Sequence, residues 1–220
     1  MDRLREAMAS ARLDALFVTE PANVFYLCGF SDFVDNAAAL LVTMDDSHVL
    51  VDPRYTIEAR TQCKDSQVRE YFGKSKIAAS AELVNELLPG SLGYDADNLT
   101  VTSFRAFRKA VDQGITLKST RGLVEKLRRT KDAHEIALIR KAAEIADATF
   151  LSVVNEIRPG MTEREVALLI DVTLRKHGAD KEAFETIAAA GPNSACPHAV
   201  PSDAVLAIGQ FLKMDFGARY

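Results

Sequence analysis

The chain has 220 residues, of which 48% are hydrophobic and 26% charged, a balance that excludes a disordered or collagen-like polymer. Its formal net charge of −4 gives it no overall attraction to nucleic acid or to an anionic membrane surface. A membrane-spanning helix needs about 18 consecutive apolar residues, and no apolar run in this sequence is that long. The three cysteines are widely spaced and odd in number, so they indicate no disulfide framework. We therefore expect a cytoplasmic protein, because the cytosol keeps thiols reduced.

The first half of the chain alternates short apolar runs with amphipathic segments. Asp52 followed by Pro53 is typical of a helix start, because Asp caps free amide groups and proline fits the first turn. Strands that alternate with helices predict an α/β domain with a mixed sheet, which we assign to residues 1–122. We expect helices over 2–12, 53–61, 75–88 and 103–111, and strands over 15–18, 38–43, 49–51, 68–71, 92–94 and 115–117.

From residue 123 the pattern becomes helical, with a short basic helix over 123–129. The pairs Asp132/Glu135 and Thr162/Glu165 are capping-box signatures, which predict two helix starts. A helix of about seven turns follows the first signature, because apolar residues recur at spacings of three and four. We expect its inward face to contain Ile136, Ile139, Ala143, Ala146, Phe150, Val153 and Ile157, and that of the second helix Val166, Leu169, Ile170 and Thr173.

The last segment combines strands with turns. We expect strands over 184–190 and 211–216, with a Gly-Pro-Asn-Ser turn after the first of them. A domain that stops at Tyr220 leaves its last strand without room for a following partner, so we expect this domain to be incomplete.

Two side chains of this segment are candidates for chemistry. Asp215 ends an apolar strand, where a carboxylate needs hydrogen bonds, a cation or a metal ion. His198 lies between two prolines in a loop. Taken alone, Asp215 is also consistent with a carboxylate bonded to backbone amides, and His198 with an ordinary loop histidine. The basic run over 126–131 has no interleaved aromatic residues, so we expect a solvated surface and no nucleic-acid contact.

Taken together, these residues resemble a known family. Ala183-Phe184, residues 187–194, Pro197-His198, Pro201 and residues 214–218 follow one another at close spacing. This order is similar to that of the Xaa-Pro aminopeptidase and prolidase family of pita-bread metallopeptidases, which includes creatinase. Similar stretches elsewhere extend the resemblance to nearly the whole chain: residues 23–30, 51–55, 129–147 and 159–163.

The resemblance implies an α/β, creatinase-like N-terminal domain over 1–122 and a partial pita-bread catalytic domain over 123–220. It implies two divalent metal ions, Mn or else Co or Zn, held by two Asp, one His and two Glu, of which Asp215 matches the first Asp. By the same match, His198 is a catalytic residue close to the substrate, and Phe184 belongs to the substrate-binding stretch. The implied activity is hydrolysis of the Xaa-Pro bond at the N-terminus of short proline-containing peptides by a homodimer.

The chain departs from the family in one important respect. The other four expected metal ligands follow Asp215 in the family and do not occur in this sequence. We therefore expect that this chain alone binds no metal ion stably and hydrolyses no peptide, since affinity depends on ligand number and charge. Two alternatives stay open: a non-catalytic module for oligomerisation or partner binding, and a creatinase-like hydrolase of a non-peptide C–N bond. Asp215 favours the metal-dependent enzyme over the second alternative.

Overall fold

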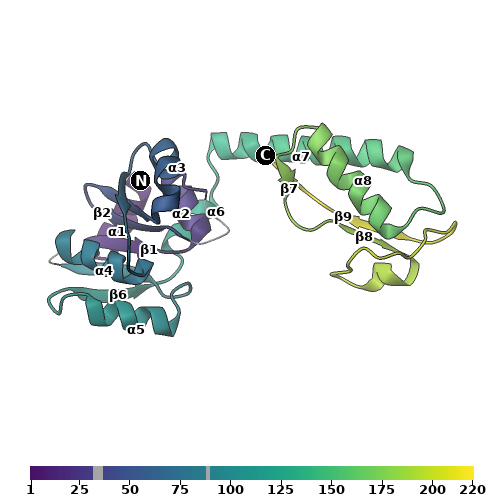
Figure 1. The fold of residues 1–220 in the computed structure, drawn as a ribbon. Coiled ribbons are helices and arrows are strands. Elements are labelled where there is room, and N and C mark those ends of the chain that lie inside the picture. Colours follow the sequence, from purple (N-terminus) through teal and green to yellow (C-terminus); the bar gives the residue numbers. More distant parts are fainter. Residues whose placement is uncertain (32–36, 88–89) are drawn as a thin grey trace. The chain divides into compact units, whose positions relative to one another are not determined.

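The computed structural model describes residues 1–31, 37–87 and 90–220, which form two compact units, Met1–Thr130 and Lys131–Tyr220 (Figure 1). The sequence expectation divided the chain after residue 122. The first compact unit continues to Thr130 because α6 (Leu123–Arg129) packs against α1 (Asp2–Ser10) and buries Val124 in the core of that unit.

A six-stranded sheet of order β4-β3-β2-β1-β5-β6 forms the centre of the first unit. β1 runs antiparallel to β2 and parallel to β5, so the sheet is mixed, which confirms the predicted fold class. The strands are β1 (Ala15–Val18), β2 (Ala39–Thr43), β3 (Ser47–Val51), β4 (Gln67–Glu70), β5 (Ser91–Asp95) and β6 (Thr116–Thr120). The remaining helices are α2 (Pro21–Cys28), η1 (Pro53–Tyr55), α3 (Thr56–Gln62), α4 (Lys76–Leu87) and α5 (Val101–Ala110).

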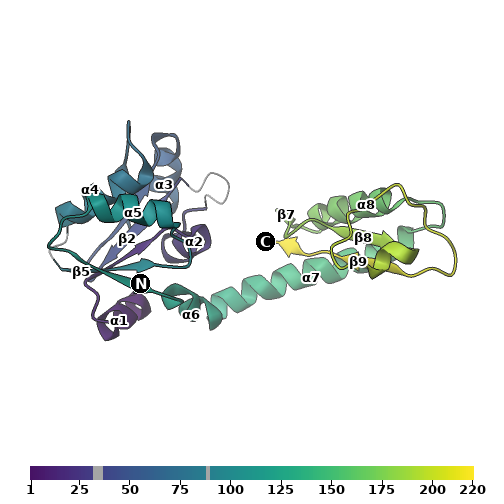
Figure 2. The ribbon, with the colours of Figure 1, turned by 90° about the horizontal axis from the view of Figure 1, so that it is seen from below.

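The two faces of this sheet are both covered by helices (Figure 2). Successive strand residues point to opposite faces, so on β1 Leu16 and Val18 join the core beneath α1, α2 and α6, whereas Phe17 joins the core beneath α4 and α5. The ring of Phe17 stacks on that of Phe107 from α5, with centroids 4.7 Å apart. The result is a three-layer sandwich.

The sequence analysis missed α2. Its Val-Phe-Tyr centre has low intrinsic helix propensity, and the helix is fixed instead by its ends. The Glu20 carboxylate accepts a hydrogen bond from the Asn23 amide at 2.7 Å, and Pro21 occupies the first turn. Gly29 ends the helix with φ +83°, a left-handed conformation that glycine adopts readily.

His48 on β3 is a buried histidine, 3% exposed, whose Nδ1 atom has no hydrogen-bond partner among the described residues. Burial and the nearby Arg69 guanidinium lower its pKa, against the opposing charges of Asp46 and Glu86. A depressed folded-state pKa means that the unfolded chain binds the proton more tightly. The first unit should therefore have its full stability above pH 6.5, the ordinary pKa of histidine, where His48 is neutral in both the folded and the unfolded chain. Its free energy of unfolding should decrease as the pH falls below that value, because the unfolded chain then takes up the proton first.

Urea unfolding of the wild-type chain and of His48→Gln at about pH 7.5 and about pH 5.5 measures this effect. We expect the unfolding midpoint of the first unit to fall with pH in the wild type and to fall less in the variant. Equal slopes in the two proteins would remove His48 as the cause.

The second unit pairs two helices with two small sheets. The two predicted helices are α7 (Ala133–Glu156) and α8 (Glu163–Lys176), and each begins with the capping box expected from the sequence. β8 (Ile187–Ala190) pairs antiparallel with β9 (Leu212–Asp215), and β7 (Lys181–Glu182) pairs with β10 (Ala218–Arg219). A 3-10 turn, η2 (Gly191–Ala195), follows β8.

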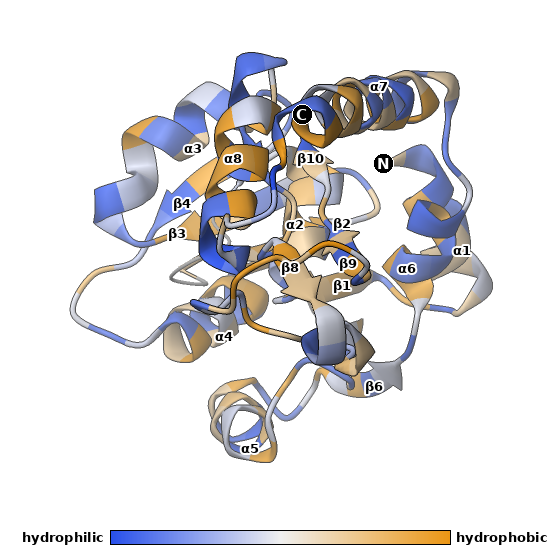
Figure 3. Cartoon of the chain, turned by 90° about the vertical axis from the view of Figure 1, so that its right-hand side faces the viewer, coloured by the Kyte–Doolittle hydropathy of each residue, from blue (hydrophilic) through white to orange (hydrophobic). Residues whose placement is uncertain are grey.

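The expected inward face of α7 is wrong in part. The residues that α7 buries are Ile145, Thr149 and Val153, whereas Ile139 and Phe150 are about half exposed. Hydrophobic residues recur around α7 (Figure 3), so their spacing allows more than one face, and packing against α8 selects the face that includes Ile145 and Val153. Across residues 1–31, 37–87 and 90–220, every helix is too short or too polar to cross a bilayer.

Candidate active site

A pocket of about 450 Å³ in the second unit brings together the three predicted site residues, Phe184, His198 and Asp215. They come from three separate stretches: the segment before β8, the loop after η2, and the end of β9. The full lining is Phe184, Glu185, Thr186, Ile187, His198, Ala199, Val200, Pro201 and Asp215. The pocket therefore combines an apolar wall with two carboxylates and one imidazole.

Asp215 occupies the last position of β9, opposite Ile187 of β8 in the strand register. Ile187 is buried, whereas Asp215 is exposed. Within the described ranges, the Asp215 carboxylate accepts no hydrogen bond, so backbone amides do not neutralise it there. The sheet fixes the backbone of this residue and leaves its side chain available to a ligand.

Phe184 lies outside the strand in which the sequence analysis placed it, since β8 begins only at Ile187. The phenyl ring packs instead over Gly217, where an added Cβ atom would lie 3.1 Å from a ring carbon. The amide of Ala183 donates to the Gly217 carbonyl at 2.9 Å, which holds the two segments together. The ring therefore forms the apolar wall of the pocket from a non-strand segment beside the end of β9.

His198 is exposed on a loop that is tied to β9. The ammonium group of Lys213 donates to the carbonyl of Cys196 and, at 3.3 Å, to that of Pro197. On the other side of the loop, the Arg164 amide donates to the Ser202 carbonyl at 3.2 Å, and the Arg164 guanidinium donates to the Pro201 carbonyl at 3.4 Å. These contacts hold the backbone on both sides of His198, while the imidazole itself stays open to the pocket.

Glu163 at the start of α8 anchors the same loop from inside the protein. It is 0% exposed, and its carboxylate accepts hydrogen bonds from the Ala190 amide at 2.7 Å, the Ser202 amide at 2.9 Å and the Ser202 hydroxyl at 2.6 Å. The Asn193 amide donates to both of its oxygens. Burial alone would raise the pKa of Glu163, but these hydrogen bonds together hold that pKa below its ordinary value.

The described residues do not by themselves form a two-metal centre. No three His, Cys, Asp or Glu side chains in these ranges lie close enough together to hold a metal ion. A stable Mn²⁺ pair needs several carboxylate or imidazole ligands, whereas this pocket offers Asp215, Glu185 and His198 around its rim without such a cluster.

Comparison with known proteins agrees with this architecture. Residues 1–130 match the creatinase/prolidase N-terminal domain family, and residues 137–220 match metallopeptidase family M24. The chain belongs to this creatinase/prolidase and M24 family. M24 metallopeptidases depend on metal ions, and the second unit is part of such a catalytic domain.

Relatives of this M24 chain cover all or nearly all of it. An uncharacterized peptidase of Bacillus subtilis, YqhT, is 31% identical over 220 residues, which are 100% of this chain and 61% of that protein. The structure of an Xaa-Pro dipeptidase from Bacillus anthracis matches 99% of the chain at 35% identity and a TM-score of 0.86, and that of an X-Pro aminopeptidase from Thermotoga maritima matches 100% at 32% and 0.88. The chain spans 59% and 61% of those two structures.

Sequence reasoning missed three residues of the M24 unit that shape the site: Glu163, Glu185 and Lys213. Glu163 and Lys213 act on partners at least 16 positions away in the sequence, so no local pattern could reveal them. Glu185 directly follows Phe184 in the predicted strand, where nothing in the local pattern distinguishes it from an ordinary exposed glutamate.

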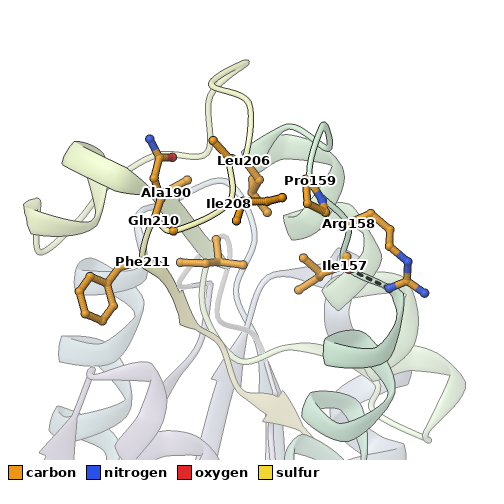
Figure 4. A pocket seen from close by; sticks show the side chains of 11 residues that line it. Ile157, Arg158, Pro159, Ala190, Leu206, Ile208, Gln210 and Phe211 are labelled. Carbon is orange, nitrogen blue, oxygen red and sulfur yellow. Dashed lines mark hydrogen bonds between the residues drawn. The ribbon is translucent and has the colours of Figure 1, made fainter.

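A second pocket, of about 250 Å³, lies between the end of α7 and the segment before β9 (Figure 4). Ile157, Leu206 and Ile208 give it an apolar lining. The Arg158 guanidinium at the edge of the pocket donates a hydrogen bond to the neighbouring Ile157 carbonyl at 2.8 Å. We assign no chemistry to this pocket.

Proposed function

We propose that this chain contributes part of the active site of an Xaa-Pro peptidase, an aminopeptidase or dipeptidase that hydrolyses the bond before proline in short peptides. Asp215 serves as one metal ligand, with Mn²⁺ as the expected ion and Co²⁺ or Zn²⁺ as alternatives. His198 donates a hydrogen bond to the substrate, and Phe184 packs against it. The 220-residue chain by itself is inactive, because it supplies only one of the expected metal ligands.

The observation that carries this proposal is the single pocket that Phe184, His198 and Asp215 line. An exposed carboxylate, an exposed imidazole and an aromatic wall around about 450 Å³ leave room for a short peptide. Proline has no backbone N–H, so an apolar wall can accept it without an unsatisfied donor. His198 has no competing hydrogen bond within residues 1–31, 37–87 and 90–220, so its ring is free to donate to a peptide oxygen.

The test compares this chain with one extended through the reading frame that follows Tyr220. Proline release from an Xaa-Pro dipeptide and from a matched Xaa-Ala dipeptide is measured with and without Mn²⁺, and bound metal is counted by elemental analysis. We expect the extended protein to release proline only with Mn²⁺ and to lose that activity in Asp215→Asn. In His198→Ala we expect a reduced kcat and unchanged metal content.

The 220-residue chain is expected to release no proline and to retain no stoichiometric metal. Metal-dependent hydrolysis by this chain would contradict the assignment of the missing ligands. An extended protein that acts on neither dipeptide would favour a module for oligomerisation or partner binding, and one that cleaves a non-peptide C–N bond without metal would favour the creatinase-like alternative.

We also propose a homodimer in the cytoplasm, to be checked by light scattering and cell fractionation. The three free cysteines fit a reducing compartment.

A further inference from the structure

Two cysteines that are 35 positions apart in the sequence meet in the first unit. The sulfur atoms of Cys28, at the end of α2, and Cys63, just after α3, lie 3.8 Å apart. Both are free thiols. A disulfide requires a separation of about 2.05 Å, so the sulfurs must approach by about 1.8 Å for a bond to form.

The neighbouring contacts keep the two segments side by side. The Ser31 amide donates to the Gln62 side-chain oxygen at 3.0 Å, and the Gln62 side-chain nitrogen donates to the Ser31 hydroxyl at 3.1 Å. A Cβ atom added at Gly29 would lie 3.5 Å from the Gln62 carbonyl oxygen, so the backbones are also close. The cysteine pair is therefore held within reach of bond formation by contacts that do not involve sulfur.

The two thiols differ in ways that assign them different roles. Cys28 is partly exposed, whereas Cys63 is buried. The hydrogen bond from the Cys63 thiol lowers the pKa of Cys28, and the same contact together with burial raises the pKa of Cys63. A thiolate is the reactive form of cysteine, so Cys28 is the thiol that meets an oxidant and Cys63 is the one that resolves the product.

We propose that Cys28 and Cys63 form a peroxide-sensitive dithiol that closes to a disulfide between the ends of α2 and α3. The Cys28 thiolate attacks one oxygen of hydrogen peroxide, the O–O bond breaks, and Cys28 becomes a sulfenic acid as hydroxide leaves and is protonated to water. The Cys63 sulfur then attacks the Cys28 sulfur, the S–O bond breaks, and the Cys63 proton leaves with the hydroxyl group as a second water. Two thiols are oxidised and one peroxide is reduced.

The experiment uses the whole chain with Cys196→Ser, which leaves only the two thiols in question. After one equivalent of hydrogen peroxide, we expect a mass loss of about 2 Da, no free thiol in denaturant, and tryptic peptides 13–54 and 61–64 joined by a disulfide. Dithiothreitol should restore both thiols. We expect the oxidised chain to unfold at a higher temperature, since the bond closes a loop in the unfolded state.

Two further variants separate the roles. Cys63→Ala in this background should stop at the Cys28 sulfenic acid, which dimedone traps, and Cys28→Ser should leave Cys63 unmodified. The proposal is overturned if both thiols survive in the Cys196→Ser chain under conditions that oxidise Cys196 in the wild type, or if the cross-link joins two chains. These outcomes are independent of peptidase activity.

Discussion

Replacement of Glu163 by alanine is expected to lower the free energy of unfolding of the second unit by about 3 to 5 kcal/mol. The substitution removes the acceptor for the Ala190 amide, for the Ser202 amide and hydroxyl, and for the Asn193 side chain. Each buried donor left without a partner costs about 1 to 3 kcal/mol. The loss should therefore exceed that of a typical helix-start substitution.

Hydrogen exchange of α8 amides, compared between the wild type and Glu163→Ala, measures this loss unit by unit. Glu156→Ala is the matched control, because Glu156 is an exposed glutamate at the end of α7, and we expect a change within about 0.5 kcal/mol. A loss in Glu163→Ala no larger than in this control would show that the hydrogen-bond network contributes little.

The same carboxylate predicts an acid-dependent loss of stability. The folded-state pKa of Glu163 lies below its ordinary value of 4.5, so its contribution is complete above pH 4.5 and is lost as the pH falls through the lowered folded-state pKa. Glu163→Gln cannot titrate, so the stability of its second unit should change less between about pH 5 and about pH 3 than that of the wild type. Identical pH profiles would exclude Glu163 as the titrating group.

Replacement of Phe107 by alanine is expected to cost about 3 to 5 kcal/mol in the first unit. Phe107 is fully buried beneath the sheet, and its ring stacks on that of Phe17 at 4.7 Å and 9°. The substitution removes apolar area from the core and leaves a cavity that the surrounding helices and strands cannot fill completely. Urea unfolding monitored by circular dichroism gives the free energy directly.

Phe72 provides the matched control for this experiment. It is 85% exposed, so Phe72→Ala should change the stability by no more than about 0.5 kcal/mol. A double-mutant cycle between Phe17→Ala and Phe107→Ala should reveal a coupling of about 0.5 to 1.5 kcal/mol from the stacked rings. Strictly additive losses would mean that the two rings contribute only through burial.

The features predicted well from the sequence are those that short segments determine. The capping boxes at Asp132 and Thr162 require only residues three positions apart, and the alternation of strands and helices gave the mixed sheet. The α7 face was less predictable, because a helix with apolar residues on several sides can bury any of them. Packing against α8 determines which face of α7 is buried, and this packing exists only in the folded structure.

Prediction of the candidate site was limited in the same way. Asp215 and His198 could be named because their neighbours form a recognisable order, and both line one pocket. Glu163 bonds to residues up to 39 positions away, and Cys28 meets Cys63 across the chain that contains β2, β3 and α3. Contacts over such distances depend on the completed fold, and a single sequence carries no local signal for them.

The bond from Lys213 to the loop before His198 has one more consequence. Residues two apart on a strand face the same side, so Lys213 and Asp215 project together from β9. Strand β9 therefore positions Asp215 directly and His198 through the bond of Lys213 to the loop. A shift of β9 by one residue against β8 would turn both Lys213 and Asp215 to the opposite face of the sheet. The distance between the Asp215 carboxylate and the His198 imidazole thus depends on how β8 pairs with β9. This strand pair is the part to preserve when the site is transplanted or redesigned.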